Sequence, residues 1–245
     1  MQLEVDVKER SLNLNFKSDL NFLLEHFESI SLKRLLEINK NEEKVDKNYF
    51  HLTFDDGLSE FYHVVAPILK EKEVHATVFL NSDFIDNKKM FFRFKASILY
   101  EKLKDESLLQ LSYKDESEID DMAQKNGVDF TNYLKEKKPY LASDQIKELI
   151  ESGFTFGAHS KNHPLYKELI LKEQINQTQE SIEAVTSNFG LSYKLFSFPF
   201  TDDGVSKKFF DVIENQIDLT FGCAGLKHDS AKHHLQRIAM ETDKS

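Results

Sequence analysis

The stretch His51-Leu52-Thr53-Phe54-Asp55-Asp56-Gly57 indicates how this 245-residue chain folds. It completes a short β-favouring run, Tyr49 to Phe54, and Gly57 interrupts that run directly after two adjacent carboxylates. We therefore expect Asp55 and Asp56 at the mouth of a strand rather than inside a core. That edge is where the active sites of α/β folds lie.

A second stretch, Gly157-Ala158-His159-Ser160-Lys161-Asn162-His163-Pro164, repeats the arrangement farther along the chain. Phe154 to Ala158 is predicted to form a strand that delivers His159 and His163, which are four residues apart. Pro164 disfavours helical geometry at His163, so we expect the two imidazoles in a loop or tight turn.

Together the two stretches offer ligands for a metal ion. One carboxylate and two imidazoles form a three-ligand set that leaves a coordination position for water, as in catalytic rather than structural zinc-type sites. The second aspartate is then free to act as a base. A His-Glu-x-x-His zinc helix does not fit because position 160 is serine, and Asp-Asp-Gly differs from the Asp-x-Asp of haloacid-type phosphotransfer. A strand-end turn with solvated carboxylates is the alternative that involves no site.

Thr53-Phe54-Asp55-Asp56-Gly57 and His159-Ser160-Lys161-Asn162-His163-Pro164 resemble the first two motifs of the polysaccharide deacetylase family, the metal-dependent carbohydrate esterases built on a distorted (β/α) barrel. The flanking segments agree with this resemblance. Residues 67–80 resemble the family's second strand region, and residues 141–149 resemble the helix before its histidine motif. The resemblance implies an α/β fold with a distorted (β/α)7-type barrel.

By this resemblance, Asp56, His159 and His163 would hold a divalent metal ion, and Asp55 would be the catalytic base. The backbone N–H of Phe200 would donate to the oxyanion. Zinc is the expected metal, and cobalt, nickel or iron suit the same ligands. The chemistry agrees with these roles, because a divalent metal lowers the pKa of its water toward roughly 7 and a neighbouring carboxylate can take the water proton.

Three features depart from the family pattern. Ser197 stands where the family commonly has an arginine that orients the base, and Arg237 or Arg93 could supply that cation from elsewhere. Arg237 is equally well explained as a surface or structural ion-pair residue. The family's acid histidine has its best local match in His228, for which a plain loop histidine is the alternative. The family's tryptophan motif is missing, because the chain has no Trp.

Outside the motifs, strand-like and helix-like segments alternate, which predicts a single α/β domain over residues 1–245. Residues 1–47 are predicted to form one or two strands and a helix that cap the barrel. Residues 84–139 interrupt the alternation with a helical stripe and an acidic run, so we expect a helical insertion there. Long insertions of this kind tend to shape substrate access.

The composition restricts the partners and the compartment. The formal net charge of −10 argues against a nucleic-acid or anionic-membrane partner, which the chain would repel. Cys223 is the only cysteine, so no internal disulfide can form, and no window approaches the run of about 18 apolar residues that a membrane span needs. The N-terminal residues lack the basic region and apolar core of a signal peptide, so a cytoplasmic protein is expected, with an exported protein whose leader has been removed as the alternative.

The sequence thus predicts a cytoplasmic, metal-dependent hydrolase that removes an N-acetyl or similar acyl group from an amino sugar in a glycan or glycan precursor. Two alternatives belong to other classes. One is a carbohydrate-binding protein that kept the barrel and lost the chemistry, which would explain the missing motif arginine and the weak match of the acid histidine. The other is a glycosyltransferase that uses Asp55 and Asp56 for a nucleotide-bound metal.

Overall fold

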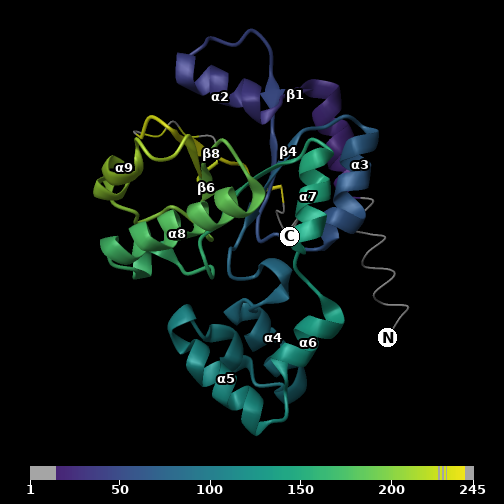
Figure 1. Ribbon diagram of the computed structural model, residues 1–245, viewed down its shortest axis with the longest axis vertical. Coiled ribbons are helices and arrows are strands. Elements are labelled where there is room, and N and C mark those ends of the chain that lie inside the picture. The colour runs from purple at the N-terminus through teal and green to yellow at the C-terminus, as the bar shows by residue number, and fades with distance from the viewer. Residues whose placement is uncertain (1–14, 226, 228, 230, 241–245) are drawn as a thin grey trace.

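The computed structural model describes residues 15–225, 227, 229 and 231–240 of the chain. At its centre is a six-stranded sheet in which all neighbouring strands are parallel, in the order β3-β4-β5-β6-β7-β8. These strands are β3 (Leu52–Phe54), β4 (Ala76–Leu80), β5 (Thr155–Ala158), β6 (Leu195–Ser197), β7 (Leu219–Gly222) and β8 (His234–Gln236). Each strand is added beside the one before it, and the sheet curls into an open half-barrel (Figure 1). This arrangement confirms the predicted α/β fold of the distorted-barrel kind.

Helices lie in the connections from β3 through to β7, as is usual between parallel strands. They are α3 (Ala66–Glu71), which continues from a π-helical turn over Phe61–Val65, α7 (Ser143–Glu151), α8 (Leu171–Phe189) and α9 (Lys207–Ile213). In Figure 1, α3 and α7 lie to the right of the sheet, and α8 and α9 lie to the left. The longest of them, α8, packs on β5 and β6 and ends at Gly190, which takes the left-handed conformation with φ 64°. No helix among the described residues is both long and apolar enough to cross a membrane.

Aromatic side chains dominate the core between the sheet and its helices. Phe156, Phe196 and Phe198 are fully buried, and the ring of Tyr166 lies 5.6 Å from that of Phe196 and 5.3 Å from that of Phe198. The Tyr166 hydroxyl shares a hydrogen bond of 2.8 Å with Thr178, so the buried ring has no unpaired polar group. Because such rings remove large apolar areas from water, this cluster is a major source of stability.

The residues before the sheet form a cap at its amino end. It consists of a helix over residues 15–26, β1 (Glu28–Ser29) and α2 (Leu32–Asn41), and β1 pairs in parallel with β2 (Tyr49–Phe50). The cap therefore contains two helices and a short strand where the sequence predicted one helix with one or two strands. Any strand before residue 15 lies outside the described residues.

His51 divides the β-favouring run that the sequence predicted as one strand. One ring nitrogen, Nδ1, lies 2.8 Å from the carbonyl oxygen of Ile30 in the cap, and Nε2 lies 2.8 Å from Thr77 Oγ1 in β4. Two separate pairings result, because β2 serves the cap and β3 serves the main sheet.

Between β4 and β5 the chain forms the predicted helical insertion. Its helices are α4 (Phe92–Leu103), α5 (Glu116–Lys125) and α6 (Phe130–Lys137), and Figure 1 shows them as a lobe below the sheet. The lobe has an apolar cluster of its own, whose buried members are Phe92, Ala96, Leu99, Leu108, Ile119 and Ala123. Phe200, from the loop after β6, packs against this cluster, so the insertion borders the carboxyl end of the sheet.

Gly157 allows β5 to lie close to both of its neighbours, and this gives the first testable prediction. A Cβ atom at this position would be 2.6 Å from Phe79 Cε1 and 2.8 Å from Leu195 Cβ, which is shorter than any normal contact. Gly157→Ala should therefore lower the free energy of unfolding by about 1–3 kcal/mol through overpacking, measured by urea titration. The loss should shrink when the same change is made in a Phe79→Leu background. Equal losses in the two backgrounds would contradict the proposed clash with the Phe79 ring.

Candidate active site

A sharp turn after β3 places two carboxylates at the carboxyl edge of the sheet. Asp56 and Gly57 both take left-handed conformations, with φ 68° and φ 61°. A Cβ atom at Gly57 would be 2.6 Å from Leu80 Cδ2, so a larger residue would have to displace the Leu80 side chain as well as adopt a left-handed backbone. The chain thus leaves the strand abruptly and presents Asp55 and Asp56 side by side.

A second turn after β5 presents the two imidazoles at the same edge. His159 follows the last residue of the strand, and the hydroxyl oxygen of Ser160 accepts a hydrogen bond of 3.0 Å from the backbone N–H of His163. Both Ser160 (φ 66°) and His163 (φ 63°) are left-handed, as Asp56 is. The parallel arrangement of β3 and β5 brings the two turns together, although β4 lies between these strands.

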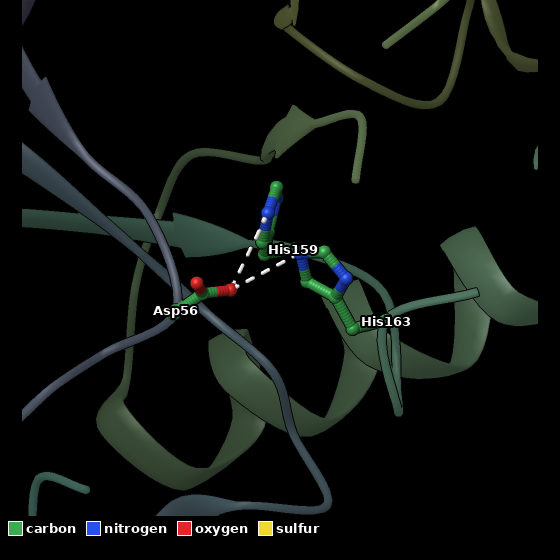
Figure 2. A group of neighbouring side chains, drawn as sticks. All are labelled: Asp56, His159 and His163. Atoms are coloured by element: carbon green, nitrogen blue, oxygen red, sulfur yellow. Dashed lines mark ion pairs between the residues drawn. The ribbon is translucent and has the colours of Figure 1, made fainter. Parts of the chain in front are cut away.

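The side chains of Asp56, His159 and His163 point toward one another, as Figure 2 shows. Asp56 Oδ1 lies 3.2 Å from His163 Nε2 and 3.7 Å from His159 Nε2, and all three ligand atoms lie within 4.8 Å of one another. The imidazoles are buried, while the Asp56 side chain keeps 35% of its surface exposed. A metal ion bound there could therefore be reached from solvent on the carboxylate side.

The hydrogen bonds around this cluster fit a divalent metal. His159 Nδ1 lies 2.8 Å from the carbonyl oxygen of Ser197 and donates to it, which leaves the lone pair of Nε2 directed at Asp56. Burial lowers the pKa of His159 below its ordinary value and so favours the neutral ring, the form that binds metals. Among the described residues, Asp56 Oδ1 is buried without a hydrogen-bond donor of good geometry. A buried acceptor of this kind calls for a partner, and a cation held between the two imidazoles would supply it.

Asp55 is held by the guanidinium of Arg237. Arg237 Nη1 and Nη2 each donate a hydrogen bond of 2.8 Å, to Asp55 Oδ1 and Oδ2 respectively. The other donors bind Thr53 Oγ1 (3.1 Å), the Gly222 carbonyl (3.2 Å) and Cys223 Sγ (3.2 Å). All five N–H groups of the side chain are thus engaged, which fixes both the guanidinium and the carboxylate in one orientation.

This environment sets the charge of Asp55. Burial raises its pKa, but the interactions with the His159 ring and with the Arg237 guanidinium more than offset burial, so the pKa lies below its ordinary value. Ser197 Oγ adds a hydrogen bond of 3.3 Å to Oδ1. Asp55 is therefore a carboxylate at neutral pH, and its Oδ2 lies 3.8 Å from His159 Nε2, beside the metal cluster.

Phe200 forms a wall of the site. It follows Pro199 with a left-handed φ of 59°, and its ring packs edge-on against the His163 ring at 4.4 Å. Within the part of the chain that the structure describes, its backbone N–H donates to no protein acceptor. Left-handed non-glycine residues cost about 1–3 kcal/mol each and often gather at functional sites, as Asp56, His163 and Phe200 do here.

His228, the candidate acid, lies outside the described residues. Two histidines that follow it in the chain and Arg93 make their contacts elsewhere. His233 binds Asn39 Oδ1 of the cap at 2.9 Å. Buried His234 lies 3.0 Å from Asp202 Oδ2 and 2.8 Å from Thr220 Oγ1. Arg93, the alternative source of a cation for Asp55, instead stacks on Phe200 with its Cζ atom 4.4 Å from the ring centroid. The expectation that Arg93 could support the base is therefore wrong.

Gln177 of α8 is a residue of the site that the sequence analysis missed. Its Oε1 accepts a hydrogen bond of 3.0 Å from the Lys161 backbone N–H, and its Nε2 donates one of 2.9 Å to Asn162 Oδ1. One amide thus holds the loop that separates His159 from His163. A glutamine on a helix gives no sequence signal for such a role, because the same pattern describes a solvated face.

Comparisons with known proteins agree with this geometry. Residues 42–220 match the family described as polysaccharide deacetylase, and the chain belongs to that family. It is thus a carbohydrate deacetylase, a hydrolase that acts on amide bonds, in a family that depends on a metal ion. No curated protein matches the chain.

Several solved structures share the fold at low sequence identity. A de-N-acetylase from Aggregatibacter actinomycetemcomitans is 14% identical with a TM-score of 0.63, over 91% of this chain and 82% of that one. The BpsB deacetylase domain from Bordetella bronchiseptica is also 14% identical with a TM-score of 0.63, over 90% and 82%. The Streptococcus pyogenes deacetylase PplD, solved in complex with acetate, is 17% identical with a TM-score of 0.57, over 87% and 74%. These similarities support the fold assignment.

The position of Gln177 leads to a prediction about metal affinity. Gln177→Leu should release the loop that carries the imidazoles and weaken zinc binding about 10-fold, measured by isothermal titration of the metal-free protein. Gln179→Leu is the matched control, because Gln179 lies on the same helix and binds Gln216 Oε1 at 2.6 Å instead. Equal zinc affinities for the two variants would show that Gln177 does not position the ligands.

Proposed function

We propose that this deacetylase removes an N-acetyl or similar short acyl group from an amino sugar of a glycan at a metal held by Asp56, His159 and His163. The observation that carries the proposal is the convergence of both imidazole Nε2 atoms on Asp56 Oδ1, next to a carboxylate that Arg237 keeps ionised. We assign the metal as zinc, because two imidazoles and one carboxylate with an open position form a common catalytic zinc set. Cobalt, nickel and iron accept the same ligands.

When bound, the metal supplies Lewis acidity that lowers the pKa of a water and polarises an acyl oxygen. Asp55 accepts the proton of the attacking water, and Arg237 keeps its carboxylate oriented and charged. The free N–H of Phe200 is assigned to the oxyanion that develops on the acyl group. His228 stays the predicted acid for the leaving amine. The cytoplasmic location likewise stays a prediction.

Two other functions fit less well. A binding protein without chemistry was suggested by the absence of an arginine at Ser197 and by the weak match of the acid histidine, and the contact between Arg237 and Asp55 removes the first of these reasons. That alternative would still require sugar affinity that survives Asp55→Asn and no acetate release by the parent protein. Membership of the deacetylase family argues against a glycosyltransferase, which would have to bind a nucleotide sugar.

Removal of the imidazoles provides the direct test of the metal site. His159→Ala and His163→Ala should each lose the metal and the activity together, because each variant leaves only two protein ligands. Metal content is measured by elemental analysis, and activity by acetate release from short N-acetylglucosamine oligomers. His233→Ala removes an imidazole that binds Asn39 in the cap and should keep both properties. Full metal occupancy in the His159→Ala/His163→Ala double variant would refute the assignment.

The role of Arg237 is tested by the pH dependence of the reaction. Asp55 works as a base only when ionised, and the guanidinium lowers its pKa, so Arg237→Met should raise that pKa and move the acidic limb of kcat/KM to higher pH. Turnover should also fall by about 100-fold or more, with metal content intact. Arg34→Met is the control, since Arg34 pairs with Glu43 on the surface. Identical pH profiles for the parent and Arg237→Met would show that Arg237 does not support the base.

A further inference from the structure

Arg93 of the insertion is a cation without an ionic partner in the described part of the chain. The described residues include three arginines, and two of them hold a carboxylate with both terminal nitrogens. Arg34 binds Glu43 at 2.7 and 2.5 Å, and Arg237 binds Asp55 at 2.8 Å through each nitrogen. No described carboxylate pairs with Arg93, although the chain has 42 acidic against 32 basic residues. An arginine left unpaired amid an acidic excess is available for a ligand.

Arg93 lies close to the active site, because its guanidinium is next to Phe200. Its Cζ atom lies 4.4 Å from the centroid of the Phe200 ring, and that ring lies 4.4 Å from the ring of His163. Two successive contacts of this length keep the guanidinium within about 9 Å of a proposed metal ligand. That span is comparable to an acylated sugar together with its nearest substituent. Arg93 is exposed, so a ligand can reach it from solvent.

Stacking on Phe200 also prepares the guanidinium for binding. A cation held over an aromatic face is fixed by the ring quadrupole, and the N–H donors in its plane remain free. This planar fork matches the paired oxygens of a carboxylate or phosphate better than an ammonium group does. The net charge of −10 repels anions at a distance, so attraction for a substrate anion has to come from a local cation of this kind.

We propose that Arg93 binds an oxyanion, a carboxylate or phosphate carried by the acylated sugar, and thereby selects anionic over neutral substrates. The inference rests on the proposed deacylation at the neighbouring metal site. Arg93 would then be a residue of the insertion that determines the substrate specificity of that reaction. Arg93 binds substrate and takes no part in bond breaking.

The test compares binding of neutral and anionic sugars by isothermal titration of the metal-loaded protein. N-acetylglucosamine is the neutral probe, N-acetylmuramic acid carries a carboxylate, and the 1-phosphate and 6-phosphate of N-acetylglucosamine carry a phosphate. The parent should bind at least one anionic sugar about 10-fold or more tightly than the neutral one, because hydrogen bonds to charged groups are the strong ones. Which of the three sugars is preferred identifies the oxyanion and its place on the ring.

Substitutions at Arg93 decide whether it causes this preference. Arg93→Gln should remove most of the ratio between anionic and neutral affinities, and Arg93→Lys should keep part of it, because the charge remains but the planar fork is lost. Lys102→Gln is the matched control, since it removes one charge from the same helix about 13 Å along its axis, where Lys102 binds the Gly127 carbonyl. A purely structural role would change both affinities equally and leave the ratio intact.

Acetate release from neutral N-acetylglucosamine oligomers by the parent protein distinguishes a failure of the proposed deacylation from a failure of the proposed role of Arg93. No release from any substrate would reject the deacylation itself. Release by the parent together with an unchanged ratio in Arg93→Gln would overturn only the role of Arg93. In turnover, the anionic preference of the parent should appear in KM rather than in kcat, and it should diminish at high ionic strength.

Discussion

The contact between Arg237 and Asp55 joins the first and last strands of an open sheet. β3 and β8 are the edge strands of the order β3-β4-β5-β6-β7-β8, and no ladder of hydrogen bonds connects them. Arg237 follows β8, and its guanidinium reaches both Thr53 within β3 and Asp55 just after it. The half-barrel is therefore bridged at its carboxyl end by side chains instead of by backbone. This ion pair, in which 15% of the arginine side chain is exposed, spans the open side of the sheet and fixes the orientation of the Asp55 carboxylate.

Ser197 shows how the same support for a base can come from another strand. At this position on β6 the family commonly has an arginine, and here a small hydroxyl side chain leaves room for a guanidinium that arrives from β8. Ser197 still serves both halves of the site, because its hydroxyl donates to Asp55 and its carbonyl accepts from His159. A cation beside the carboxylate lowers its pKa, and that cation can be supplied by a different strand.

The parts of the site that sequence could predict are those with a local cause. Asp55 and Asp56 follow a β-favouring run that ends at glycine, and Pro164 keeps His163 out of a helix. Since the carboxyl ends of parallel strands meet at one edge, a predicted α/β fold is enough to bring these two turns together. The assignment of metal ligands and base came from the family resemblance, with which the observed distances agree.

Other features depend on the whole fold and could not be predicted from the local sequence. Whether Arg237 or Arg93 reached Asp55 depended on the curl of six strands and on the packing of the insertion. Gln177 acts from the next helix, 15 and 16 residues after the loop residues that it holds, and that helix gives no sequence signal for the contact. The left-handed conformations of Asp56, Ser160 and His163 carry no sequence signal either, because such positions usually favour glycine. The division of Tyr49–Phe54 at His51 also could not be predicted, because it depends on contacts of His51 with Ile30 of the cap and Thr77 of β4.

Phe200 connects the insertion to the chemistry, because it belongs to two packing units at once. Its ring lies against the His163 ring on one side and against the apolar cluster of the insertion on the other. A left-handed phenylalanine is costly, by about 1–3 kcal/mol, and persists only where surrounding contacts over-determine it. Those contacts come largely from the insertion, through Phe91 and the stacked guanidinium of Arg93. The insertion therefore contributes to the site itself, since its packing holds the Phe200 ring against the His163 ring and supports the left-handed backbone at Phe200.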